Sequence, residues 1–104
     1  MDPWSLQQAQ KSLDQLLECK NPRCVYDFFA QDLSKNSRED IYIFIKDHSP
    51  VKIVRECAEQ EKPLKMLKQE KCFMLKLKKQ DEVQILWRNE NGQWKLSNAA
   101  KRKI

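Results

Sequence analysis

The only glycine of the chain, Gly92, follows Asn91 and lies between two stretches in which apolar and polar residues alternate. Asn-Gly is a preferred pair for the centre of a type I′ turn, because both central residues of that turn need a positive φ. Such a two-residue turn joins two antiparallel strands and fixes the register in which they pair. The stretch WRNENGQWKLS therefore predicts a hairpin with four cross-strand pairs: Glu90 with Gln93, Asn89 with Trp94, Arg88 with Lys95, and Trp87 with Leu96.

A third strand is predicted before this hairpin, because Phe73, Leu75 and Leu77 recur at every second position. Pairing Leu75 with Ile85 places the apolar residues of all three strands, including both tryptophans, on one inner face. The opposite face is then basic with a small apolar centre, formed by Cys72, Met74, Lys76, Lys78, Gln84, Leu86, Arg88 and Lys95. Arg88 faces Lys95 across the two strands, and we expect these like charges to splay into solvent.

Helical periodicity dominates the part of the chain that precedes these strands. Asn21-Pro22 and Ser49-Pro50 each combine a capping side chain with proline at the first helical position. We predict one helix over residues 3–19, a second from residue 22 onward, a third over residues 50–60 and a short fourth over residues 63–70.

Residues 41–45, with the sequence IYIFI, allow two interpretations. Ser37 with Asp40 resembles a capping box, which favours a helix. Five successive apolar residues that are all β-branched or aromatic are instead typical of a short buried strand. We favour the strand.

With 104 residues, 40% of them hydrophobic, the chain can form one domain around one core. We predict an α+β fold for residues 1–104, with a helical part over residues 3–70, a three-stranded antiparallel meander over residues 72–97 and a basic tail over residues 98–104. The helices pack on one face of the sheet. Because such a core needs no disulfides, we expect the four cysteines to be reduced. No apolar run has the length of a signal peptide or a membrane span, so we expect the cytoplasm or, for a eukaryotic or viral protein, the nucleus.

The residue patterns that enzymes and metal sites need are missing from the sequence. His48 is the only histidine, and its neighbours Asp47 and Ser49 are too close in sequence to form a catalytic triad with it. A single glycine rules out the glycine-rich phosphate loops. The cysteines lack the paired spacing of zinc knuckles. We therefore expect no enzymatic activity, no metal or other cofactor, and no small-molecule substrate.

Charge is distributed unevenly along the chain. Residues 1–60 contain 8 basic and 10 acidic residues, whereas residues 61–104 contain 12 basic and 5 acidic residues. A basic half of this kind predicts a surface for DNA or RNA. Base-reading side chains are sparse, so we expect contacts to the phosphate backbone with little sequence specificity. The candidate residues are Lys65, Lys68, Lys71, Lys76, Lys78, Lys79, Arg88, Lys95, Lys101, Arg102 and Lys103.

With a strand at residues 41–45, the elements of residues 22–88 follow the order helix, strand, helix, helix, strand, strand. This order resembles the winged helix-turn-helix family, which serves for DNA and RNA binding and also for protein docking. The resemblance implies a recognition helix in PLKMLKQEK, residues 63–71, and a wing in KLKKQDEVQ, residues 76–84.

Two alternatives remain open. The chain could be a protein-interaction module, such as a small regulator, inhibitor or assembly factor of a larger protein, with Trp4, Tyr26, Met74 and Leu86 as apolar anchors. Separately, the ending VQILWRNENGQWKLS is similar to the closing hairpin of nuclear-transport-factor-like domains. That resemblance implies helices on one face of a curved antiparallel sheet and a ligand-binding function. None of these interpretations involves a membrane.

Overall fold

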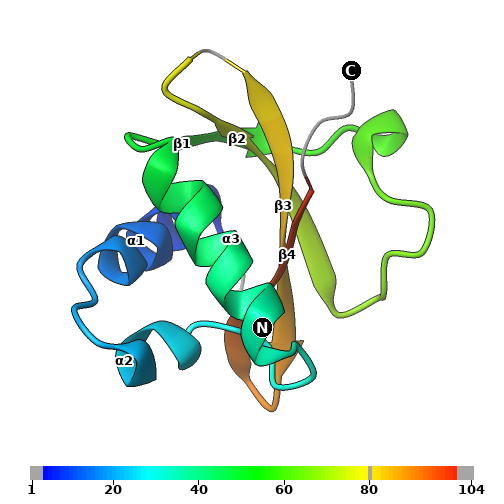
Figure 1. The fold of residues 1–104 in the computed structure, drawn as a ribbon. Coiled ribbons are helices and arrows are strands. Elements are labelled where there is room, and N and C mark those ends of the chain that lie inside the picture. The colour runs from blue at the N-terminus through cyan, green and yellow to red at the C-terminus, as the bar shows by residue number, and fades with distance from the viewer. Residues whose placement is uncertain (1–3, 80, 101–104) are drawn as a thin grey trace.

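Three helices precede a four-stranded sheet in the computed structural model, which describes residues 4–79 and 81–100 (Figure 1). The helices are α1 (Leu6–Leu17), α2 (Pro22–Tyr26) and α3 (Lys35–Asp47). The strands are β1 (Lys52–Glu56), β2 (Glu70–Lys76), β3 (Glu82–Glu90) and β4 (Gln93–Ala100), with a 3-10 turn, η1 (Glu59–Glu61), between β1 and β2. The strands form an antiparallel meander in the order β1-β2-β3-β4.

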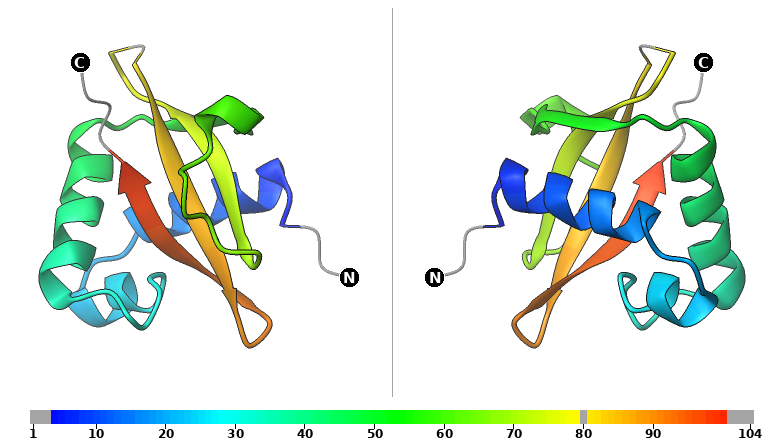
Figure 2. Two further views of the ribbon diagram at one scale, coloured as in Figure 1. Left: turned by 90° about the vertical axis from the view of Figure 1, so that its right-hand side faces the viewer. Right: turned by 90° about the vertical axis from the view of Figure 1, so that its left-hand side faces the viewer.

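All three helices lie on the same side of this sheet, as the two side views in Figure 2 show. The α+β class and the placement of the helices on one face are therefore confirmed. The predicted three-stranded meander is wrong by one strand, because β1 adds a fourth.

Local capping explains where the first two helices begin. The Ser5 hydroxyl accepts a hydrogen bond from the Gln8 backbone N–H at 3.2 Å, and the Gln8 side chain accepts one from the Ser5 N–H at 2.9 Å. This capping box starts α1 at Leu6, later than the predicted residue 3. Asn21 caps α2 through the Cys24 N–H at 2.9 Å, with proline at the first helical position as predicted.

The strand predicted at residues 41–45 is wrong, because this segment belongs to α3. Ser34 caps the helix by accepting a hydrogen bond from the Ser37 N–H at 3.1 Å. Within the helix only Ile45 is fully buried, while Ile43 is 52% exposed. Ile41, Tyr42 and Phe44 are partly buried against the same core, so most of the run is apolar because it packs there, and Ile43 alone within the run is exposed.

The helix predicted over residues 50–60 is also wrong, because this stretch forms β1. Val51 and Ile53 are buried on either side of exposed Lys52, which is the alternation of a strand. No helix forms at residues 63–70 either. Without a strand at 41–45 and a helix at 50–60, the element order on which the winged-helix resemblance depended is absent.

The predicted hairpin register is confirmed at all four pairs, from Glu90 with Gln93 to Trp87 with Leu96. Asn91 and Gly92 have φ values of +52° and +86°, as the type I′ turn requires. The pairing of β2 with β3 differs from the prediction by two residues, since Leu75 faces Val83 and not Ile85. A shift of two residues leaves every side chain on its predicted face.

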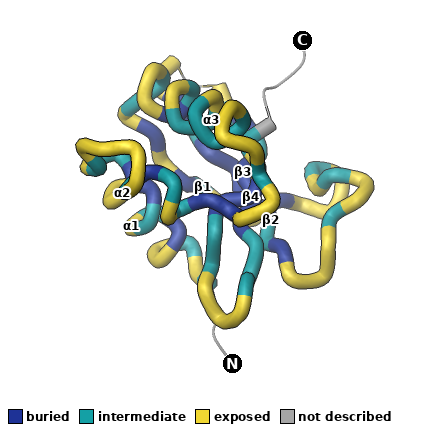
Figure 3. Tube along the Cα trace, turned by 60° about the horizontal axis from the view of Figure 1, so that its bottom comes forward, coloured by how far each residue is buried: buried dark blue, intermediate teal, exposed yellow. Residues whose placement is uncertain are grey.

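The main core lies between this inner face of the sheet and the helices. Trp87, Phe73 and Ile85 pack there at 1% exposure or less, together with Leu13 and Leu16 of α1. Figure 3 shows buried residues gathered along the strands, while exposed residues mark the turns and the outer sides of the helices. In the described ranges 4–79 and 81–100, no helix is long and apolar enough to span a membrane.

Candidate functional site

The outer face of the sheet is covered by the segment between β1 and β2, residues 57–69, which we call the covering loop (Figure 2). Met66 of this loop and Val54 pack against a second apolar cluster formed by Cys57, Cys72, Met74 and Leu86. Met74 and Leu86 are only 8% and 4% exposed. These two residues were predicted as apolar anchors for a partner, but both are buried, and Met66 of the covering loop packs against them.

A disulfide joins Cys57 to Cys72 within the outer cluster, and a second disulfide joins Cys19 to Cys24. The expectation of reduced thiols is therefore wrong. The Cys57 N–H donates to the Cys72 carbonyl at 2.9 Å, so β1–β2 pairing brings the two Cα atoms to 5.3 Å. The Asn21-Pro22 turn brings Cys19 and Cys24 to a Cα separation of 5.6 Å. Both separations suit a disulfide.

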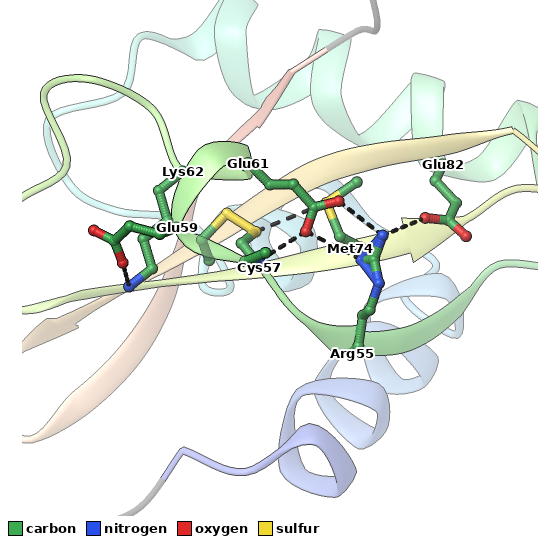
Figure 4. The surroundings of a disulfide bond; sticks show 9 residues. Arg55, Cys57, Glu59, Glu61, Lys62, Met74 and Glu82 are labelled. Carbon is green, nitrogen blue, oxygen red and sulfur yellow. Dashed lines mark hydrogen bonds and ion pairs between the residues drawn. A yellow bond between two sulfur atoms is a disulfide. The ribbon is translucent and has the colours of Figure 1, made fainter.

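An ion-pair network holds the first end of the covering loop. Arg55 donates to both carboxylate oxygens of Glu61, at 3.2 and 2.7 Å, and to Glu82 at 3.0 Å. The same Glu61 carboxylate accepts the Ala58 N–H at 2.7 Å. Figure 4 shows Arg55 reaching across to both glutamates beside the disulfide. Bidentate pairing of this kind fixes geometry as well as charge, so η1 is held against the sheet.

A buried carboxylate holds the second end. The Glu70 side chain is only 7% exposed. One of its oxygens accepts hydrogen bonds from Nε and Nη2 of Arg88, both at 3.2 Å. Its other oxygen accepts a hydrogen bond from the Leu67 backbone N–H at 2.9 Å. Arg88 also donates to Asp32 at 2.9 Å. Burial alone would lower the pKa of the Arg88 guanidinium, but the hydrogen bonds to Asp32 and Glu70 outweigh it and raise that pKa. Arg88 therefore remains a cation, and its charge is already balanced by the carboxylates of Glu70 and Asp32.

These carboxylates also correct the prediction that Arg88 and Lys95 splay apart into solvent. The two residues face each other as predicted, but Arg88 turns to Glu70 and Asp32, and the Lys95 ammonium donates to the Asp27 carbonyl. These protein acceptors reduce the repulsion between the two cations.

The predicted nucleic-acid residues do not form one surface. Arg88 and Lys95 are engaged as described, and Lys71 lies on the inner-face side of β2, where it donates to the Trp4 carbonyl at 3.4 Å. Lys76 is half-buried at the end of β2, opposite Lys52 and Glu82. Among the predicted lysines, the exposed ones form two groups, Lys65 and Lys68 in the covering loop and Lys78 and Lys79 after β2. Lys101, Arg102 and Lys103 lie outside the described residues.

The two other predicted anchors also contact side chains of this protein. Trp4 stacks on Trp94, with ring centroids 5.6 Å apart, and so belongs to the core layer. The Tyr26 hydroxyl donates to Glu39 at 2.9 Å, and this hydrogen bond raises the pKa of Tyr26. Tyr26 lines a groove of about 580 Å³ between α2 and α3, beside the exposed Ile43.

The covering loop instead exposes two residues that the sequence analysis did not single out as anchors. Leu64 is 104% exposed and Leu67 is 45% exposed, although Met66 between them packs inward. Lys62 pairs with Glu59 at 3.3 Å, whereas Lys65 and Lys68 have no carboxylate within 4 Å among the described residues. The repeated Leu-Lys pattern of PLKMLK was the available signal, and it was interpreted as a helix.

Comparison with protein-family models, curated proteins and solved structures found no similar protein, so the functional argument depends on this geometry.

Proposed function

We propose that this protein is a non-enzymatic interaction module that docks through its covering loop onto an acidic, partly apolar surface of a larger protein. The observation that carries the proposal is the full exposure of Leu64, next to Leu67 and two uncompensated lysines, on a loop whose ends are fixed. Large apolar side chains presented in this way are costly in water and are typical of contact sites.

The fixed ends matter for affinity. The disulfide, the Arg55–Glu61 pair and the Glu70–Arg88 pair restrain the loop before any partner arrives, so less conformational entropy is lost on binding. Burying one leucine side chain contributes about 1.5–3 kcal/mol. Two leucines could therefore account for most of the energy of a compact contact, with the lysines steering an acidic partner to the loop.

An acidic protein fits this surface better than DNA or RNA. Backbone-directed nucleic-acid binding uses cations and has no use for two exposed leucines. The exposed lysines of the predicted nucleic-acid set are also split between the loop and the turn after β2, at the opposite end of that strand. A role as a small regulator, inhibitor or assembly factor is consistent with such docking. Because disulfides persist in oxidising environments, we place the encounter in an oxidising compartment instead of the cytoplasm.

The proposal can be tested by selecting short random peptides displayed on phage against the immobilised protein. We expect selected peptides to combine acidic and apolar residues and to bind in fluorescence anisotropy with an affinity that falls as salt increases. Leu64→Ser with Leu67→Ser should weaken binding by at least about 10-fold. Ile43→Ser is the matched control, because Ile43 is also exposed but lies on α3, and it should bind like wild type.

Two outcomes would reject the proposal. If the selected peptides bind the double serine variant as tightly as wild type, the covering loop does not form the contact. Tight binding of a labelled single-stranded oligonucleotide that is lost in Lys65→Ser with Lys68→Ser, but kept in the leucine variant, would favour nucleic acid.

A further inference from the structure

A separate depression of about 590 Å³ lies between α1 and the hairpin that joins β3 to β4. We call it the tryptophan pocket, and the lining residues used below are Trp4, Phe28, Trp94, Gln8, Gln15 and Gln93. Its size falls within the range of small-molecule sites. It is built from none of the residues of the covering loop, so it can be judged independently of the proposed docking function.

The aromatic side of the pocket is formed in advance. Trp4 lies between the other two tryptophans, with its ring 5.6 Å from Trp94 at an interplanar angle of 17° and 5.9 Å from Trp87. Trp87 is buried in the core, whereas Trp4 and Trp94 are half-buried. The pocket therefore offers flat, apolar ring surface whose orientation is set by the core.

The rim of the pocket is rich in uncharged amides. Gln15 and Gln93 are exposed, and their side chains make no hydrogen bond within the described part of the chain. Gln8 uses its carbonyl oxygen to accept the Ser5 N–H, which leaves its amide donors free. An amide group both donates and accepts hydrogen bonds, as a hydroxyl group does.

The charged residues of the lining are Lys11, Lys95 and Asp27, which together carry a net charge of +1. The Lys95 ammonium already donates to the Asp27 backbone carbonyl. The pocket therefore offers no cluster of cations that would hold a strongly anionic ligand. A neutral ligand with one apolar face and several hydroxyl groups matches the ring surface and the amide rim together.

The two indole N–H groups give a second indication of a ligand. Nε1 of Trp4 and Nε1 of Trp94 are buried and have no hydrogen-bond partner among the described residues. Buried tryptophan N–H groups normally find an acceptor. A ligand oxygen that reaches either N–H group would supply the missing acceptor.

We infer that the tryptophan pocket binds a neutral saccharide. A pyranose ring combines a C–H face, which can lie on an indole, with a rim of hydroxyls that the glutamine amides can bind. The inference adds a ligand site to the proposed docking function and does not depend on it.

Tryptophan fluorescence provides the test, because two of the three tryptophans line the pocket. Wild-type protein is titrated with glucose, N-acetylglucosamine, maltose, cellobiose and chitobiose, and we expect a saturable change in emission with at least one of them. Gln15→Ala, which alters no fluorophore, should weaken that binding by about 3- to 10-fold, as expected for one neutral hydrogen bond. Gln7→Ala is the matched control, since Gln7 is exposed on the same helix but does not line the pocket.

Trp94→Phe should retain more affinity than Trp94→Ala, provided that circular dichroism shows both variants folded. The Leu64→Ser, Leu67→Ser variant should bind the saccharide normally, which separates this test from that of the docking function. Absence of a saturable change with every sugar, or equal affinities in Gln15→Ala and wild type, would overturn the inference. So would tighter binding of AMP or UMP than of any sugar, because it would identify the rings as a base-stacking surface.

Discussion

Replacing Cys57 and Cys72 together by alanine should lower the free energy of unfolding by about 3 kcal/mol. The bridge joins residues 15 positions apart, and closing a chain segment of this length restricts the unfolded ensemble. The Cys19–Cys24 bridge spans only 5 positions, for which the same relation gives about 2 kcal/mol. The longer bridge should therefore matter more, although both close a connection between neighbouring elements.

Urea unfolding followed by circular dichroism measures this difference. Under oxidising conditions the midpoints should fall in the order wild type, Cys19→Ala with Cys24→Ala, then Cys57→Ala with Cys72→Ala. A loss of 3 kcal/mol corresponds to a drop of roughly 12–24 °C in melting temperature for a domain of this size. In the presence of a reductant, wild type should lose both contributions and unfold before either oxidised variant.

Two results would refute this reasoning. Mass spectrometry after thiol labelling of the unreduced protein could show four reactive cysteines, which would mean that neither bridge forms. Equal midpoints for all three proteins under oxidising conditions, with no reactive thiol in wild type, would show that the bridges form but do not restrict the unfolded chain.

Three further predictions concern single residues. Glu70→Gln keeps the side-chain shape but removes the charge that faces Arg88. Urea titration should therefore show that the free energy of unfolding falls by about 1.5–3 kcal/mol. An unchanged midpoint would mean that Asp32 and Glu90 are sufficient partners for Arg88. Gly92→Ala should lower the free energy of unfolding by about 1–2 kcal/mol through backbone strain alone. The φ angle is +86°, and an added Cβ would meet no atom within 4 Å. A melting temperature equal to that of wild type would contradict this prediction. The hydrogen bond to Glu39 raises the pKa of Tyr26 in the folded protein, so its stabilising contribution is complete below about pH 10 and is lost as the pH rises through the raised pKa. Absorbance at the phenolate band should show a late-ionising tyrosine that disappears in Tyr26→Phe.

The helical segments show where sequence patterns fail. Residues 50–60 satisfied a helical pattern through Val51, Val54 and Ala58, but the strand pairing of Ile53 with Leu75 adds a fourth strand to the sheet. Residues 41–45 have β-branched composition, yet the Ser34 cap starts a helix upstream that continues through them. In the first case strand pairing outweighs the local pattern, and in the second a cap upstream outweighs the composition of the segment.

The candidate site was predicted only in part. Lys65 and Lys68 were identified as exposed cations, and both are exposed. Leu64 and Leu67 fall within the helix predicted over residues 63–70, but that helix does not form and both leucines face solvent. The sequence could not show this, because Met66 is the residue that meets the outer cluster, and that cluster exists only once β2 pairs with β1 and β3.

The sequence by itself determined the hairpin, its register and the face that carries Trp87 and Trp94. These depend on the φ preferences of Asn91 and Gly92 and on a two-residue alternation, which act between residues close together in the chain. The tertiary structure alone decided the disulfide pairs, the cover over the outer face and the neutralisation of Arg88 by Glu70 and Asp32. In each of these features the interacting groups come together only through strand pairing or a reversal of the chain. No local sequence pattern could therefore predict them.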